Sequence, residues 1–198
     1  MIDKPDLSIN KSLQERSELI SMNIDYLTNQ IELIANEVTN CIKESGKIFF
    51  CGNGGSAAES QHMAAEYCAT LDHNKPRVGM AALALTTDSS FLTAWGNDFG
   101  YDGIFKRQLE TLGESGDLLF AYSTSGNSKN VCIAAEYAIS NNIKVIGMTG
   151  NHKNTELEKN SNILLKAPSS KTPNIQEIHT IVGHEVCKLV EQKIFNFT

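Results

Sequence analysis

Two short polar loops contain the residue types in this sequence that point most directly to chemistry. The first, Gly52-Asn53-Gly54-Gly55-Ser56, follows the apolar segment 47–51, and the second, Ser123-Thr124-Ser125-Gly126-Asn127-Ser128, follows the apolar segment 117–122. A strand that runs into a Gly- or Ser-rich turn and then a helix directs backbone N–H groups, hydroxyls and the positive end of the helix dipole toward one point. Such a point binds anions, and neither loop matches the dinucleotide or NTPase pattern. We therefore expect a small phosphorylated metabolite, such as a sugar phosphate.

A histidine and a glutamate, His62 and Glu66, lie four residues apart on the helix expected after the first loop. This spacing puts both side chains on one helix face, where they either share a metal such as zinc or form an ordinary surface contact. On the last helix, His179 and His184 are five residues apart and diverge, so at most one of them is expected to serve a site. Combined with Gln176 and His184, the first pair would make a metal site with nitrogen and oxygen ligands, or an acid–base set.

The segment Asn97-Asp98-Phe99-Gly100 is expected to form a polar turn after the second strand. Ordinary turn chemistry explains its composition. Its place next to a strand end equally makes Asn97 and Asp98 candidates for binding sugar hydroxyls. Both interpretations stay open at the level of sequence.

The apolar pattern after Gly46 alternates between expected strands and helices. Most of the strands are continuous apolar runs, which is typical of a parallel sheet covered on both faces. The expected strands are 47–51, 80–85, 117–122, 143–148 and 162–166, and the helices lie near 56–70, 88–95, 102–112 and 128–141, with a last helix that begins at the cap pair Thr172-Pro173. This order predicts an α/β, doubly wound, mostly parallel five-stranded sheet, with ligands beyond the carboxyl ends of the strands.

A single long helix is expected from about residue 8 to residue 44, a stretch without Gly or Pro. Its apolar residues recur every three or four positions, so the helix must bury a stripe. The stripe either lies on the core of its own domain or joins a bundle with helices of sister subunits, and the second interpretation is favoured. The predicted organisation is therefore an N-terminal helix for oligomerisation, 1–44, and a core-bearing domain, 45–198.

Composition excludes several classes of protein. The net charge of −6 comes without a basic run, so a nucleic-acid surface is not expected. Residues 1–6 lack the basic and apolar parts of a signal peptide, and no apolar run approaches the ~20 residues that span a membrane. The five cysteines are scattered without a C-x-x-C pair, which indicates thiols of a reducing compartment. We expect a cytoplasmic protein without membrane partners.

These motifs together resemble the sugar isomerase (SIS) fold, and within it the phosphoheptose isomerase family, over about residues 23 to 190. The resemblance lies in six motifs in the family's order: 51–58 (CGNGGSAA), 61–66 (QHMAAE), 85–88 (LTTD), 96–100 (GNDFG), 123–128 (STSGNS) and 175–179 (IQEIH). It implies an enzyme that isomerises sedoheptulose 7-phosphate to D-glycero-D-manno-heptose 7-phosphate, at the start of activated-heptose synthesis for bacterial surface polysaccharide. It also implies a homotetramer with one zinc ion per subunit.

The resemblance also assigns roles to residues. It implies zinc bound by His62, Glu66, Gln176 and His184. Within the enediol mechanism of such isomerases, we expect Glu66 to act as the base and His184 as its acid partner. The implied substrate contacts, to which Ser56 is our addition, are Asn53, Gly54, Gly55, Ser56, Glu66, Asn97, Asp98, Ser123, Thr124, Ser125, Ser128 and Gln176.

Two alternatives belong to the same fold. A regulator of DNA replication initiation resembles this family and binds the initiator protein, but its pattern lacks the glutamate and histidine that match Glu66 and His184. An isomerase for another phosphosugar, or a phosphosugar-sensing module, is the other alternative. Two departures from the family's pattern, Thr70 and Asn174 where arginines are common, bear on which sugar is bound and how tightly.

Overall fold

A computed structural model describes residues 9–197 of the chain, so the N-terminal segment 1–8 and residue 198 lie outside the described residues. Five parallel strands form one sheet in the order β2-β1-β3-β4-β5. The strands are β1 (Ile48–Cys51), β2 (Ala82–Ala84), β3 (Leu118–Tyr122), β4 (Lys144–Thr149) and β5 (Ile163–Lys166). The predicted α/β fold with a five-stranded sheet is confirmed, and every one of its pairings is parallel.

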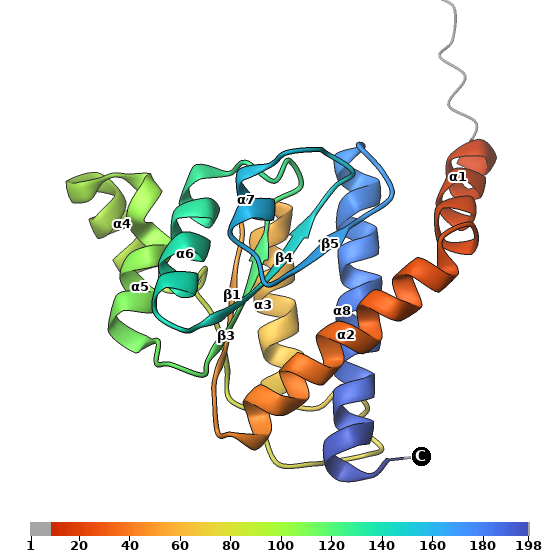
Figure 1. Cartoon of the computed structure of the whole chain (residues 1–198), viewed down its shortest axis with the longest axis horizontal. Coiled ribbons are helices and arrows are strands. Elements are labelled where there is room, and N and C mark those ends of the chain that lie inside the picture. The colour runs from red at the N-terminus through yellow and green to blue at the C-terminus, as the bar shows by residue number, and fades with distance from the viewer. Residues whose placement is uncertain (1–8, 198) are drawn as a thin grey trace, which may run out of the picture.

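Helices cover both faces of this sheet (Figure 1). They are α1 (Ile9–Ser21), α2 (Ile24–Lys43), α3 (Gly55–Cys68), α4 (Ser89–Phe99), the 3-10 turn η1 (Tyr101–Gly103), α5 (Ile104–Leu112), α6 (Lys129–Ser140), α7 (Glu156–Lys159) and α8 (Thr172–Phe195). Side chains alternate along β1, so that Ile48 and Phe50 join the core under α2, α3 and α8, while Phe49 and Cys51 join the core under α5 and α6. The fold therefore has three layers.

The two polar loops meet at the point where the sheet changes winding direction. Strands β1 and β3 are neighbours, with Cys51 opposite Ala121, so both carboxyl ends reach the same edge. Helix α3, which follows β1, packs on one face, and α6, which follows β3, packs on the other. Helices that leave on opposite faces open a crevice between the strand ends, which is where ligands bind in such sheets.

The N-terminal segment forms two helices, so the expected single helix over residues 8–44 is wrong. The chain turns at Met22 and Asn23, where the Asn23 amide donates to the Leu19 carbonyl. Helix α2 buries residues such as Ile34 and Val38 in the core of this chain, whereas none of the residues Ile9–Ser21 of α1 is buried. The apolar stripe thus divides into a core half and an exposed half.

Three smaller expectations change. The polar turn expected at 97–100 is largely helical, because α4 extends to Phe99. Helix α8 begins at Thr172, with Lys171 rather than Thr172 in the capping position. The short helix α7 had no counterpart among the expected elements.

No helix among residues 9–197 has the length and apolar character needed to cross a membrane. All five cysteines lie in this range, and each has a free thiol.

Candidate active site

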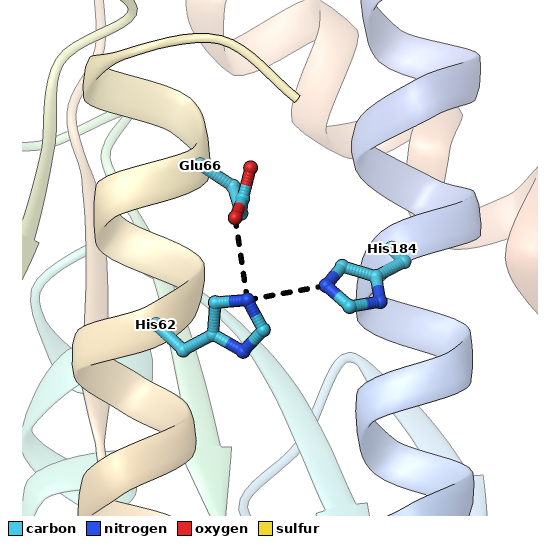
Figure 2. A group of neighbouring side chains, drawn as sticks. All are labelled: His62, Glu66 and His184. Carbon is cyan, nitrogen blue, oxygen red and sulfur yellow. Dashed lines mark hydrogen bonds and ion pairs between the residues drawn. The ribbon is translucent and has the colours of Figure 1, made fainter. Parts of the chain in front are cut away.

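Helices α3 and α8 run side by side in the same direction and supply most of the candidate site. A Cβ atom added to Gly183 would lie 2.5 Å from the Met63 sulfur, so only a glycine lets the two helices approach this closely. Next to this contact, His62 and Glu66 of α3 face His184 of α8 (Figure 2). The close packing of the two helices thus places these three side chains together.

The side chains of Glu66 and His184 both approach the Nε2 atom of His62. His62 Nε2 lies 3.2 Å from Glu66 Oε1 and 3.2 Å from His184 Nε2, and one potential ligand atom of each residue lies within 4.8 Å of the others. A tetrahedral metal with bonds near 2.1 Å separates its ligands by about 3.4 Å. Two imidazole nitrogens and a carboxylate oxygen are a donor set that zinc uses. The chemistry and spacing of this group therefore fit a divalent metal.

The side chain of Gln176 lies elsewhere in this chain. A Cβ added to Gly55 would lie 2.5 Å from its Nε2 atom, so the amide rests against the first turn of α3. Gly55 precedes His62 by seven residues, and Gln176 precedes His184 by eight, which is about 10 to 12 Å along each helix. The structure brings three of the four predicted metal ligands together and places Gln176 about two helical turns away.

A polar cavity of about 220 Å³ lies between the first turns of α3 and α8. It is lined by Gly55, Ser56, Glu59, Pro173, Gln176, Glu177, His179 and Thr180. Within the described part of the chain, the buried atoms Glu59 Oε1 and His179 Nδ1 on this lining have no hydrogen-bond partner. Buried polar atoms are rarely left without a partner. The cavity therefore suits a ligand rich in hydroxyl groups.

Glu59 connects this cavity to the metal-like group. Its Oε2 atom accepts a hydrogen bond from the Thr180 hydroxyl at 2.7 Å and lies 4.0 Å from His62 Nδ1. The cavity and the three converging side chains are thus adjacent parts of one site. The sequence contained a signal for Glu59, because it is an acid three residues before His62 on the same expected helix.

His179 is buried and points away from the converging group, as its five-residue spacing from His184 suggested. Its Nε2 atom lies 3.2 Å from the Thr149 carbonyl, and its ring packs against Tyr122. Burial lowers the pKa of His179 to about 4, so the ring is neutral at pH 7. Burial, followed by the charge of Glu59, raises the pKa of the Tyr122 phenol. Both side chains are therefore neutral at pH 7, and of the two only His179 lines the cavity.

The first polar loop is held to the opposite layer by an amide pair. Asn53 Nδ2 donates to Asn130 Oδ1 at 2.8 Å, and Asn130 Nδ2 donates back to Asn53 Oδ1 at 2.9 Å. The Tyr101 hydroxyl also donates to Asn53 Oδ1. Asn130, on α6, and Tyr101 were not predicted, because only the tertiary fold brings them to residue 53. Gly54 caps α3 with a φ of +57°.

The second polar loop is built around the buried Ser123. Its hydroxyl donates to Ser128 Oγ at 2.9 Å and accepts from the Ser128 N–H at 3.2 Å, while Ser125 Oγ lies 3.4 Å away. The Thr124 carbonyl accepts from the Gly150 N–H, which ties the loop to the end of β4. Three hydroxyls thus gather before the first turn of α6, where the sequence predicts an anion-binding loop.

The remaining candidates lie away from the cavity. Asn97 and Asp98 are exposed on the last turn of α4, where the Asn97 amide donates to the Asp98 carboxylate at 2.7 Å. Of the two departures from the family pattern, Thr70 bonds to the carbonyls of Asp72 and Lys75. Asn174 is buried, and its amide donates to Glu15 of α1.

Comparisons with known proteins identify the family of this chain. The model of the SIS domain matches residues 13–150 of the chain. A phosphoheptose isomerase of Akkermansia muciniphila is 47% identical over 169 residues, which cover 85% of this chain and 88% of that protein. The solved phosphoheptose isomerases of Neisseria gonorrhoeae (36% identical, TM-score 0.85) and Francisella tularensis (32%, 0.86) each match 93% of this chain, and the matches cover 97% and 96% of those chains. The chain therefore belongs to the phosphoheptose isomerase family of SIS-domain proteins.

Proposed function

We propose that this protein isomerises sedoheptulose 7-phosphate to D-glycero-D-manno-heptose 7-phosphate, at the start of activated-heptose synthesis for bacterial surface polysaccharide. The observation that carries the proposal is the convergence of His62, Glu66 and His184 beside a polar cavity and two anion-type loops. Family membership agrees with it, since the relatives named above are phosphoheptose isomerases over nearly their whole length.

The converging group is the proposed zinc site. His62, Glu66 and His184 would hold the ion, one per subunit, and a bound zinc would polarise the carbonyl and hydroxyl oxygens of the sugar as a Lewis acid. Gln176 lines the cavity, so its first role is a contact with the sugar. As a fourth metal ligand it would have to come from a second copy of the chain, which would place the site between subunits.

The proton transfers fall to two of the same residues. Converting a ketose into an aldose moves a proton from C1 to C2 through an enediol, while a hydroxyl proton passes between the two oxygens. The Glu66 carboxylate takes the C1 proton and returns it at C2. The His184 imidazole would exchange a proton with the sugar oxygens through Nδ1, because its Nε2 atom faces His62 in the proposed metal site. The reaction needs no oxidant or reductant, because its atoms and electrons balance within the sugar.

The loops would fix the substrate's register. The hydroxyls of Ser123, Ser125 and Ser128 and the N–H groups before α6 would hold the terminal phosphate, far from the reacting carbons. The remaining proposed contacts to the sugar are Asn53, Gly54, Gly55, Ser56, Asn97, Asp98 and Thr124. Asn97 and Asp98 reach the substrate only if α4 or a second copy brings them to it.

We propose a cytoplasmic homotetramer. The exposed apolar side chains of the first two helices and of the turn between them, such as Leu13, Met22 and Ile24, would be covered by other copies. Five free thiols agree with a reducing compartment. Light scattering coupled to size exclusion would measure the mass, with four times 21.7 kDa expected. A monomer of normal activity would contradict the assembly.

The alternatives lead to different results with the purified protein. A replication regulator has no use for the group formed by Glu66, His62 and His184, so the geometry does not favour it. Sedoheptulose 7-phosphate and unphosphorylated sedoheptulose should be compared at equal concentration, with fructose 6-phosphate as a third substrate. We expect turnover of the heptose phosphate alone. Preference for another phosphosugar would reassign the substrate, and turnover of none would contradict the isomerase.

A further inference from the structure

A buried arginine, Arg77, lies behind the candidate site in the loop between α3 and β2. Its side chain is 1% exposed, and its partner, Glu191 of α8, is 5% exposed. Arg77 Nε donates to Glu191 Oε1 at 2.7 Å. The same carboxylate oxygen accepts the Leu71 N–H at 3.1 Å. The loop after α3 is thus joined to α8 by a desolvated ion pair.

The arginine also closes the end of α3. Arg77 Nη2 donates to the Glu66 carbonyl at 2.8 Å, and Nη1 donates to the Tyr67 carbonyl at 2.9 Å. The last carbonyls of a helix have no partner within the helix, and a cation there is favourable. The guanidinium therefore holds the turn that carries the Glu66 side chain.

The carboxylate partner lies on the same helix as His184. Glu191 follows His184 by seven residues, which is close to two full turns, so both point toward α3. Cys187 lies between them and contacts Arg77. One planar, forked side chain consequently connects the Glu66 turn of α3 to the His184 face of α8.

Stability alone is a weak reason for such a pair. Burying two charges costs desolvation, and well-packed apolar residues of similar size often serve as well or better. Accurate spacing between two helices is a different requirement, since groups behind metal ligands determine how well the ligands converge.

We propose that Arg77 and Glu191 are positioning residues that set the spacing between Glu66 and His184, and through it the affinity of the site for a divalent metal. This inference rests on the proposed metal site. It assigns no contact with substrate to either residue.

The test uses the full chain and measures zinc affinity by competition with a chromogenic chelator, together with thermal stability. In Arg77→Met/Glu191→Leu, apolar side chains of similar size replace the pair, and we expect a melting temperature near that of the parent with zinc bound at least about tenfold more weakly. Arg77→Lys keeps the charge and loses the fork, so it should also bind zinc more weakly. If the double variant does not fold, the zinc affinity of Arg77→Lys alone tests the positioning role.

The matched control is Asp117→Asn. Asp117 is a buried carboxylate paired with Lys47 at the amino ends of β3 and β1, and it accepts the N–H groups of Lys47 and Glu114. This variant should lose stability and keep the zinc affinity of the parent. A kcat that falls more than KM rises in the Arg77 variants would agree with misplaced Glu66.

The possible results distinguish a failure of the positioning role from a failure of the proposed function. Zinc affinity within about twofold of the parent in folded Arg77 variants would overturn the positioning role and leave the isomerase intact. A parent that binds zinc but turns over no sugar phosphate would contradict the proposed function, while zinc affinity still decides the role of Arg77. A parent without zinc binding overturns both the metal site and this inference.

Discussion

Replacing Glu66 by glutamine should remove the proposed catalytic base and leave the fold intact. The amide matches the carboxylate in shape, but it accepts no proton from the C1 position of a sugar. The loss of a general base lowers rates by ~10²- to 10⁴-fold, equivalent to about 3–5 kcal/mol of transition-state stabilisation. Glu66 is 21% exposed, and its carboxylate pairs with the half-exposed His62, a contact worth about 1 kcal/mol or less in unfolding free energy. Activity should therefore fall far more than stability.

The assay compares kcat with sedoheptulose 7-phosphate and the melting temperature for the parent, Glu66→Gln and a control, Glu110→Gln. Glu110 is 27% exposed and also forms a pair over one helical turn, with Lys106 of α5. The control thus removes a similar carboxylate far from the site and should retain full activity. Activity of Glu66→Gln within about threefold of the parent would refute its assignment as the base.

Three further predictions concern the loop, the core and the buried histidine. The double variant Ser123→Ala/Ser125→Ala should have a higher KM, because each hydrogen bond to a charged phosphate contributes roughly 1.5–3 kcal/mol. If inorganic phosphate protects this variant from heat as well as it protects the parent, these hydroxyls do not bind the phosphate. Removing residues 1–40 should give unfolded or aggregated protein in size exclusion, because Ile34 and Val38 belong to the core; a folded, active monomer would contradict this. Burial lowers the pKa of His179 from 6.5 to about 4. Between these pH values the unfolded chain binds a proton that the folded state excludes. The free energy of unfolding should therefore fall by about 3 kcal/mol as the pH is lowered from 6.5 to 4. Acid unfolding of His179→Gln should lack this contribution, and an unchanged pH slope would contradict it.

The sheet and its loops could be predicted because their signals are local. Continuous apolar runs such as 118–122 identify buried parallel strands, and the Ser- and Gly-rich turns that follow them are contiguous in sequence. The spacing of His62 and Glu66 likewise needs only helical geometry. The break at Met22 and Asn23 had no Gly or Pro to announce it, so the local sequence predicted one continuous helix.

The rest of the site depends on packing between distant segments. The parallel arrangement of α3 and α8 decides that His184 meets His62 while Gln176 meets Gly55, and no spacing within α8 contains that information. Asn130 and Arg77 were missed for the same reason, since their partners lie 77 and 114 residues away.

The most direct test of the central claim is a time course of the purified protein with sedoheptulose 7-phosphate in D₂O, followed by NMR. Proton transfer through an enediol predicts that an aldoheptose 7-phosphate appears, with solvent deuterium at C2 in those molecules whose proton exchanges with the solvent while Glu66 holds it. Addition of a zinc chelator should stop the reaction, and zinc should restore it. A ketose that stays unchanged at high enzyme concentration, even with zinc added, would contradict the claim.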